Sequence, residues 1–343
     1  MIKPNRLKPG DKIAIVSLSW GGLGDKKYIH KYYIAKERLE NIFGLEVITM
    51  PNALKGSDFI YEHPELRAKD LMDAFQDKSI KVIICAIGGD DTIRLLPFID
   101  YDIIKNNPKI FMGYSDTTVN HFMMHKAGLV SYYGPCIMSE FGEYTKILDY
   151  TKDAVMNILF QDSANLSIES SPIWSDDFIE WNEENIHKQI KVKKEEHGYE
   201  LLQGNGIVEG VLLGGCLDVF PMIVGTEIWP QLKEWQGKIL LLETSEDEPT
   251  PDYITWYLRN LGSQGIFDVI QGIIVGKPHH EKYYEEYKEV IIKVLKEYHQ
   301  EDLPVLYNIN IGHSDPVGIL PLGTKIQIDY TNKKIILLES ATN

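Results

Sequence analysis

The chain alternates short apolar runs with longer segments in which apolar residues recur every three or four positions. Apolar runs occupy residues 12–18, 81–87 and 110–113, and a loop rich in glycine or serine follows each of them. Helical spacing follows at 27–43, 64–77 and 117–126. This alternation predicts an α/β domain with a parallel sheet between helices. In such sheets, ligands bind at the carboxyl ends of the strands.

The pattern changes in the second half. Residues 161–205 are polar and charged, and Trp174 and Trp181 interrupt them. After residue 206 the apolar runs are strand-like again, with helical spacing at 251–261 and 283–300. We therefore expect an N-terminal α/β domain over 1–160, a linker and active-site loop over 161–205, and a C-terminal β-rich α/β domain over 206–343.

The composition disfavours several classes of function. The 343 residues hold 35 Lys and Arg against 50 Asp and Glu, a net charge of −15, which disfavours nucleic-acid binding. No window of 18 apolar residues occurs, so no membrane partner is expected. Cys85, Cys136 and Cys216 are scattered and form no metal-binding pattern, which is typical of reduced thiols. With no secretory signal recognised, the expected location is the cytoplasm.

The segment Met112-Gly113-Tyr114-Ser115-Asp116-Thr117 carries the strongest chemical signal. A serine at a sharp turn between strand and helix is exposed, and backbone N–H groups beside it can hold an oxyanion. The second glycine of a Gly-x-Ser-x-Gly motif is absent. Ser115 or Asp116 could equally serve only as a helix N-cap.

A nucleophilic serine needs a base and an acid that orients the base. His313 lies in a turn-rich stretch after Gly312, which suits a base aimed by a shaped loop. Glu243 ends the apolar run 239–242, where a carboxylate needs a partner. A backbone-bonded turn histidine and a strand-end ion pair are the alternatives. Residues 246–248, all acidic, are interpreted as solvated loop charges.

The glycine loops favour no nucleotide cofactor. Gly88-Gly89 follows an apolar run and could approach a ligand closely, but neither a Gly-x-Gly-x-x-Gly fingerprint nor a P-loop is complete. A dinucleotide-dependent oxidoreductase therefore stays open only as a weak alternative.

Taken together, these segments resemble serine peptidase family S66, which contains the LD-carboxypeptidases of murein recycling and the microcin C immunity (MccF-type) peptidases. The order and spacing of six pieces carry the resemblance: 88–91, 113–116, 214–217, 242–243, 272–276 and 312–313.

The resemblance implies a triad in which Ser115 is the nucleophile, His313 the general base and Glu243 the orienting acid. It also implies an oxyanion hole from the N–H groups of Gly89 and Asp116, no metal and no cofactor, and a homodimer. The fold that it implies is a flavodoxin-like N-terminal domain and a C-terminal swivelling β-rich α/β domain, with the site in the cleft between them. Gly214, Gly215 and Cys216 fall in a substrate-binding segment, with Cys216 where many relatives have Asn.

The long 161–205 segment resembles the MccF-type branch, in which an aromatic loop covers a nucleotide. Trp174 and Trp181 are the candidates for stacking on the base, although both could instead fill the core between domains. We therefore expect a serine carboxypeptidase that cleaves peptidyl- or aminoacyl-nucleotide conjugates. An LD-carboxypeptidase of murein tetrapeptides and a non-catalytic binding module of the same fold are the alternatives.

Overall fold

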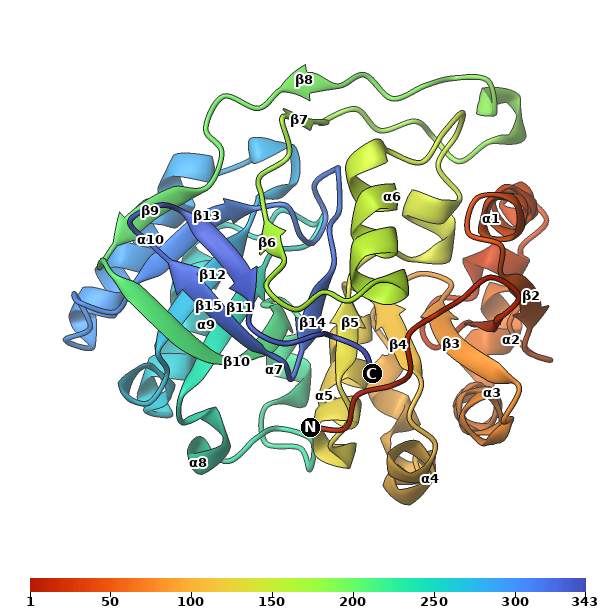
Figure 1. The fold of residues 1–343 in the computed structure, drawn as a ribbon, viewed down its shortest axis with the longest axis horizontal. Helices are drawn as coiled ribbons and strands as arrows, with labels where there is room; N and C mark the ends of the chain where they lie inside the picture. Colours follow the sequence, from red (N-terminus) through yellow and green to blue (C-terminus); the bar gives the residue numbers. More distant parts are fainter.

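The structure is a computed structural model that describes residues 1–343. The chain forms two large sheets flanked by helices (Figure 1). The first sheet has the order β14-β5-β4-β3-β1-β2. Its strands are parallel, except that β14 runs antiparallel to β5. The strands are β1 (Lys12–Val16), β2 (Glu46–Thr49), β3 (Ile80–Cys85), β4 (Ile110–Gly113), β5 (Ser131–Tyr133) and β14 (Leu320–Leu322).

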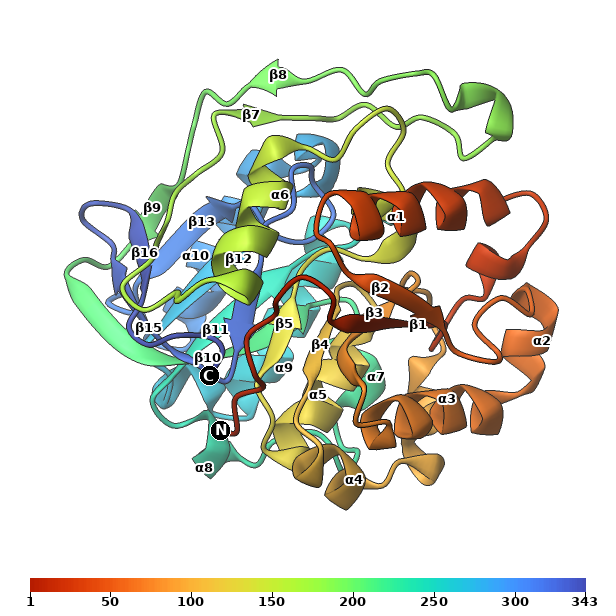
Figure 2. The same ribbon diagram turned by 45° about the vertical axis from the view of Figure 1, so that its right-hand side comes forward.

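Helices cover both faces of this sheet. In Figure 2, α1 lies on one face, and α3, α4 and α5 lie on the other. The helices of this half are α1 (Ile29–Asn41), α2 (Ser57–Glu62), α3 (Pro64–Gln76), α4 (Tyr101–Asn106), α5 (Thr117–Ala127) and α6 (Asp149–Val155). Strand β4 is buried along its whole length, because a parallel sheet covered on both faces has no solvent side. The α/β class predicted from the sequence is confirmed.

A short helix of another type follows the Gly88-Gly89 loop. Residues 92–98 make a 3-10 helix, η2 (Thr92–Phe98), with Pro97 inside it. A proline ring has no N–H to donate and clashes with the preceding turn, so it disfavours a regular α-helix at this point.

The second sheet has the order β6-β16-β15-β10-β11-β12-β13-β9. Its centre, β10 to β13, is parallel, and the outer strands pair antiparallel. The strands are β6 (Ser167–Ile168), β9 (Glu200–Gln203), β10 (Ile207–Cys216), β11 (Lys238–Glu243), β12 (Gly272–Gly276), β13 (Val305–Ile309), β15 (Lys325–Asp329) and β16 (Lys334–Leu337). Its helices are α7 (Phe220–Ile223), α8 (Leu232–Trp235), α9 (Pro251–Ser263) and α10 (Tyr284–Glu297).

The two sheets share a core. Phe122 of α5 stacks on Trp229 with ring centroids 5.5 Å apart, and it meets Phe220 of α7 edge to face. Strand β14 comes from the C-terminal part of the chain but pairs with β5 of the first sheet. These contacts hold the two sheets together and bring the carboxyl ends of β4 and β11 toward each other.

An overhanging segment, residues 170–198, arches along one side of the molecule (Figure 1). It contains the short strands β7 (Ile173–Trp174) and β8 (Lys193–Lys194), which pair with each other. The Ser171 N–H donates to Asn310 Oδ1 at 2.8 Å, and the Thr145 hydroxyl donates to the Lys188 carbonyl at 2.8 Å. The segment is therefore tied to both halves of the molecule.

All three cysteines are free and buried, as expected from their spacing. No helix of the structure combines the length and the apolar character that a membrane-crossing helix requires.

Candidate active site

Ser115 lies in the turn that joins β4 to α5. Its φ of 62° is in the left-handed region, which a non-glycine residue rarely adopts and which the surrounding structure must hold in place. The preceding residue, Tyr114, is buried and donates its hydroxyl to Glu140 Oε1 at 3.0 Å. A Cβ on Gly88 would lie 2.9 Å from the Ser115 hydroxyl oxygen, so only glycine fits there. The turn thus presents the hydroxyl of Ser115 beside the loop that follows β3.

Two backbone N–H groups at this turn have no partner in the chain. The N–H groups of Gly89 and Asp116 donate to no backbone carbonyl. The buried carboxylate of Asp116 does not cap α5; it accepts from Ser19 Oγ at 2.7 Å and from the Thr92 N–H at 2.9 Å. Asp116 therefore fixes the two loops beside Ser115, while its own N–H donates to no group of the chain.

Glu243 and His313 meet at the end of β11. Glu243 is 1% exposed, and its Oε2 lies 2.8 Å from His313 Nδ1. Gly312 has a φ of 93°, and a Cβ there would lie 2.3 Å from Glu243 Oε2. The glycine before His313 is thus what lets the histidine loop approach the carboxylate.

Tyr133 of β5 connects this pair to the serine turn. Its hydroxyl donates to Glu243 Oε1 and accepts the Ser115 N–H at 3.2 Å. The ring of Tyr114 lies 5.0 Å from that of His313, edge to face. The fold therefore gathers Ser115, Glu243 and His313, which are far apart in sequence, around one buried hydroxyl. Sequence reasoning did not single out Tyr133.

The other imidazole nitrogen of His313 faces a second carboxylate. His313 Nε2 lies 3.0 Å from Glu246 Oε2, and no hydrogen bond joins it to the Ser115 hydroxyl. Burial acts to lower the pKa of His313, but the charges and hydrogen bonds of Glu243 and Glu246 outweigh it and raise that pKa well above its ordinary value. The hydrogen bond to His313 lowers the pKa of Glu246 to about 2.

The interpretation of residues 246–248 as solvated loop charges is incomplete. The Glu246 side chain is 61% exposed and still contacts His313, and Glu248 contacts two further histidines. The available sequence signal was the position of these three acidic residues, which lie only a few residues after Glu243. The loop that leaves β11 at Glu243 passes close to the histidine that Glu243 contacts.

Gly214, Gly215 and Cys216 end β10 beside Glu243. A Cβ on Gly214 would lie 1.9 Å from the Leu241 carbonyl oxygen, and one on Gly215 would lie 2.6 Å from Thr118 Oγ1. The Cys216 N–H donates to Thr118 Oγ1 at 3.0 Å. Burial raises the pKa of the Cys216 thiol well above its ordinary value. These residues hold β10 close to β11 and α5.

The two tryptophans of the overhanging segment lie in different surroundings. Trp174 is buried, with Lys277 Nζ 4.3 Å from its ring centroid. Trp181 is partly buried and meets Tyr28 edge to face at 6.3 Å, and Tyr28 in turn meets Trp20 at 5.3 Å. The backbone N–H of Trp20 donates to the Gly88 carbonyl. Trp181 is thus joined through aromatic rings to the loop beside Ser115, whereas Trp174 is buried against the ammonium group of Lys277.

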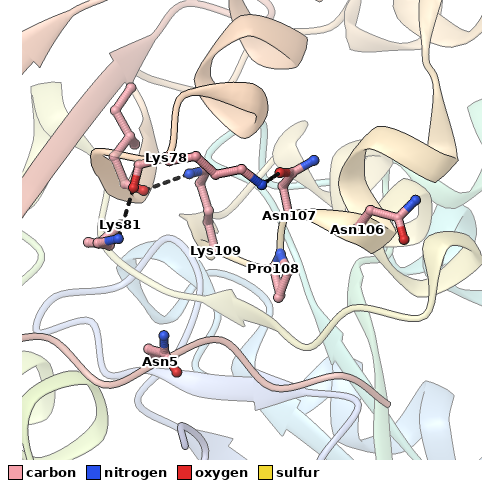
Figure 3. Close-up of a pocket in the computed structure, with 8 residues that line it drawn as sticks. Asn5, Lys78, Lys81, Asn106, Asn107, Pro108 and Lys109 are labelled. Atoms are coloured by element: carbon pink, nitrogen blue, oxygen red, sulfur yellow. Dashed lines mark hydrogen bonds between the residues drawn. The ribbon is translucent and has the colours of Figure 1, made fainter.

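A lysine-lined pocket lies at the opposite edge of the first sheet (Figure 3). It is formed where β3 and β4 begin, and Ser115 follows the end of β4. The ammonium groups of Lys78, Lys81 and Lys109 all donate to Asn107 or to backbone carbonyls. This pocket therefore offers no unpaired lysine to a ligand and belongs to a different part of the molecule.

Comparison with known proteins gives the family. The LD-carboxypeptidase N-terminal domain model of peptidase family S66 matches residues 13–134, and the C-terminal domain model matches residues 209–328. The chain belongs to this family and is a serine peptidase of the carboxypeptidase type.

Relatives of two kinds are found within the family. The chain is 35% identical to the microcin C7 self-immunity protein MccF of Escherichia coli over 280 residues, which cover 80% of this chain and 78% of that protein. It is 27% identical to a probable murein peptide carboxypeptidase of Bacillus subtilis over 339 residues, covering 98% and 94% of the two chains. An MccF-like protein from Streptococcus pneumoniae, solved in complex with AMP, superposes with a TM-score of 0.87 at 36% identity, covering 96% and 98%.

Proposed function

We propose that this chain is a serine carboxypeptidase in which Ser115 is the nucleophile, His313 the general base and Glu243 the group that orients the imidazole. The observation that carries the proposal is the connection through Tyr133, whose hydroxyl contacts both the Ser115 N–H and Glu243 while Glu243 binds His313 Nδ1. A carboxylate on Nδ1 fixes the tautomer that leaves Nε2 free to accept a proton.

The reaction would proceed by acyl transfer. For His313 Nε2 to take the proton of Ser115, the Ser115 hydroxyl must first replace Glu246 as its partner. The serine oxygen then attacks the amide carbonyl, and the N–H groups of Gly89 and Asp116 hold the oxyanion. His313 gives the proton to the departing amine, and water then hydrolyses the acyl-serine ester.

For the substrate, we propose a peptidyl- or aminoacyl-nucleotide conjugate of the microcin C type. The support is the MccF relatives, one of them solved with AMP, together with the aromatic set Trp20, Tyr28 and Trp181 beside the serine loop. A base stacked on an aromatic side chain gains about 1–3 kcal/mol. Trp181 is therefore the proposed base-stacking residue, and Trp174 is proposed to be a buried structural residue of the overhanging segment.

A second candidate substrate is a murein tetrapeptide. Glu246 places negative charge beside His313, which disfavours an anionic phosphate and favours a peptide that carries an ammonium group. The murein peptide carboxypeptidase relative supports the same substrate class. The homodimer, the cytoplasmic location and the division at residues 160 and 206 remain predictions.

One experiment separates these activities. The purified chain is incubated with aspartyl sulfamoyl adenosine or with an L,D-linked murein tetrapeptide, and the products are followed by mass spectrometry. We expect cleavage of the nucleoside conjugate, lost in Ser115→Ala and kept in Ser79→Ala, a remote exposed serine. Cleavage of the tetrapeptide alone, lost in the same variant, would assign the chain to the murein branch. Binding without cleavage of either substrate would contradict the peptidase proposal and favour a binding module.

A further inference from the structure

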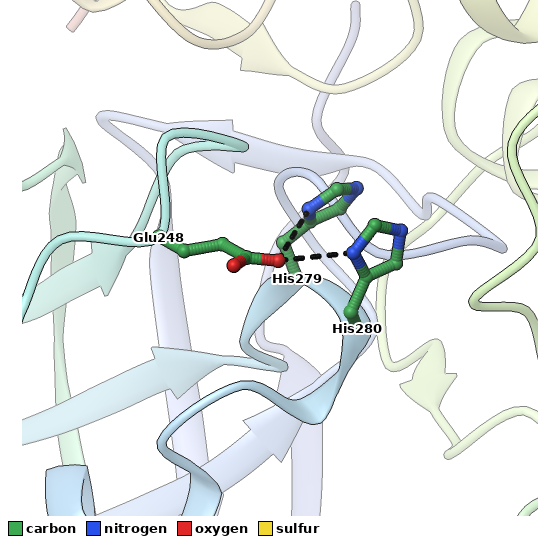
Figure 4. A group of neighbouring side chains, drawn as sticks. All are labelled: Glu248, His279 and His280. Atoms are coloured by element: carbon green, nitrogen blue, oxygen red, sulfur yellow. Dashed lines mark hydrogen bonds and ion pairs between the residues drawn. The ribbon is translucent and has the colours of Figure 1, made fainter.

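Glu248, His279 and His280 converge at the edge of the second sheet (Figure 4). Glu248 lies in the loop after β11, and the two histidines lie in the loop after β12. Glu248 Oε1 is 3.0 Å from His280 Nδ1 and 3.6 Å from His279 Nδ1. Both imidazoles therefore turn the same nitrogen toward one carboxylate oxygen.

The spacing of these three atoms matches that of metal ligands. In a tetrahedral zinc site, bonds of about 2.0–2.2 Å place neighbouring ligand atoms roughly 3.3–3.5 Å apart. The two distances to Glu248 Oε1 lie on either side of that value, and all three atoms are within 4.8 Å of one another. Two of the three spacings are therefore close to those of metal ligands.

Hydrogen bonding within the cluster leaves one ligand atom unused. His279 Nδ1 is buried and has no hydrogen-bond partner, although it faces Glu248. The two imidazole rings lie with centroids 3.7 Å apart. A buried ring nitrogen without a partner is costly, and a metal ion shared by both rings would satisfy it.

Contacts from neighbouring elements hold both loops in place. The Tyr287 hydroxyl of α10 donates to the Pro249 carbonyl at 2.5 Å, directly after Glu248. Buried Lys277 donates to Glu281 Oε1 at 2.6 Å. This hydrogen bond links the residues on either side of the two histidines in the chain. The ligand geometry is thus set before any ion binds.

We propose that Glu248, His279 and His280 bind one divalent transition-metal ion of the Zn²⁺ type, with solvent as the fourth ligand. The three side chains are 28%, 21% and 39% exposed, so an ion can enter from solvent. This ion takes no part in the acyl transfer proposed above.

The test is metal binding by the full chain, independent of any substrate. Metal-free protein is titrated with ZnCl₂ by calorimetry and with CoCl₂ by visible absorption. We expect one Zn²⁺ per chain and the intense d–d bands of four-coordinate Co²⁺. His280→Ala should weaken Zn²⁺ binding by at least about 100-fold, since even outer-shell changes cost 10–100-fold. Glu248→Gln should weaken it as well, and thermal unfolding shows whether each variant is folded.

The matched control is the pair His63 and Glu65. Its Nδ1–Oε1 distance is also 3.0 Å and it is similarly exposed, but it has no second imidazole. His63→Ala should leave Zn²⁺ binding unchanged. Absence of stoichiometric Zn²⁺ binding would overturn the proposal, and so would binding that survives both His280→Ala and Glu248→Gln. Binding lost in His313→Ala but kept in His280→Ala would overturn it too, by placing the ion at the catalytic histidine.

Discussion

The serine side and the histidine side of the candidate active site are pre-organised for the proposed reaction to different degrees. On the serine side, the Ser115 turn is fixed by Tyr114 and Asp116, and two N–H groups are free. On the histidine side, the imidazole of His313 lies between buried Glu243 and exposed Glu246. The N–H groups proposed to bind the oxyanion are therefore in place before substrate arrives, whereas His313, the proposed base, must first lose a competing partner.

This difference separates two roles that carboxylates play at one histidine. Glu243 contacts Nδ1 and favours the tautomer that catalysis needs. Glu246 contacts Nε2 and favours the protonated form, which cannot act as a base. The same residue type thus supports the reaction on one nitrogen and opposes it on the other.

The largest effect is expected from Glu243→Gln. The amide keeps the shape of the side chain but no longer orients a neutral imidazole or balances its charge, so kcat should fall about 10⁴-fold. Steady-state kinetics on the cleaved substrate measures this. Glu209→Gln, an exposed glutamate on β10, serves as the control and should retain full activity. A loss below tenfold in Glu243→Gln would remove Glu243 from the triad.

A smaller loss is expected from Gly312→Ala. The added Cβ would press on Glu243 Oε2 and displace the pair by a fraction of an ångström to an ångström, which should lower kcat about 100-fold. Gly225→Ala is the matched control, because Gly225 also has a positive φ but has open space around its Cβ position. Both variants should lose stability in thermal unfolding, and only Gly312→Ala should lose activity. Equal kcat in the two variants would contradict this account of the histidine loop.

Trp181→Ala tests the aromatic side of the site. If a base stacks there, the loss of about 1–3 kcal/mol should raise KM for the nucleoside conjugate roughly 5- to 150-fold and leave kcat close to wild type. Trp181→Phe should recover most of the affinity. Trp174→Ala should instead lower the unfolding temperature, because Trp174 is buried. An unchanged KM in Trp181→Ala would refute base stacking at this residue.

Glu246→Gln should have the smallest effect, visible in the pH profile. Because Glu246 helps raise the pKa of His313, kcat/KM of the wild type should rise with pH through a midpoint above the ordinary histidine value of about 6.5. Removing that charge lowers the pKa of His313, so the midpoint should move to lower pH and activity near pH 7 should increase a few-fold. Asp247→Asn removes the same charge one residue away and should shift the midpoint less. A shift to higher pH would have the wrong sign.

The serine side was also the easier side to predict from the sequence. The buried run 110–113, the turn at Ser115 and the helix beginning at Thr117 are adjacent in the chain, so local pattern describes them well. The approach of Glu243 to His313 joins two loops 70 residues apart, and only the family resemblance indicated it. Tyr133 and Glu246 were missed, because neither position stands out until the strands are assembled.

Long-range pairing limited the prediction of the fold in the same way. The parallel strands alternate with helices and were recognisable from sequence. Strand β14, however, does not pair with the strands that precede and follow it in the sequence; it pairs with β5 of the first sheet. Its three buried residues carry no signal for the sheet with which they pair.

The most direct test of the triad is covalent labelling with a phosphonofluoridate, which reacts with activated serines. Intact mass and peptide mapping should give one adduct per chain, located on Ser115, and labelling should become much slower in His313→Ala and Glu243→Gln. An adduct on another serine, no adduct in folded wild-type protein, or labelling of either variant at the wild-type rate would contradict the assignment of Ser115, Glu243 and His313 as the catalytic triad.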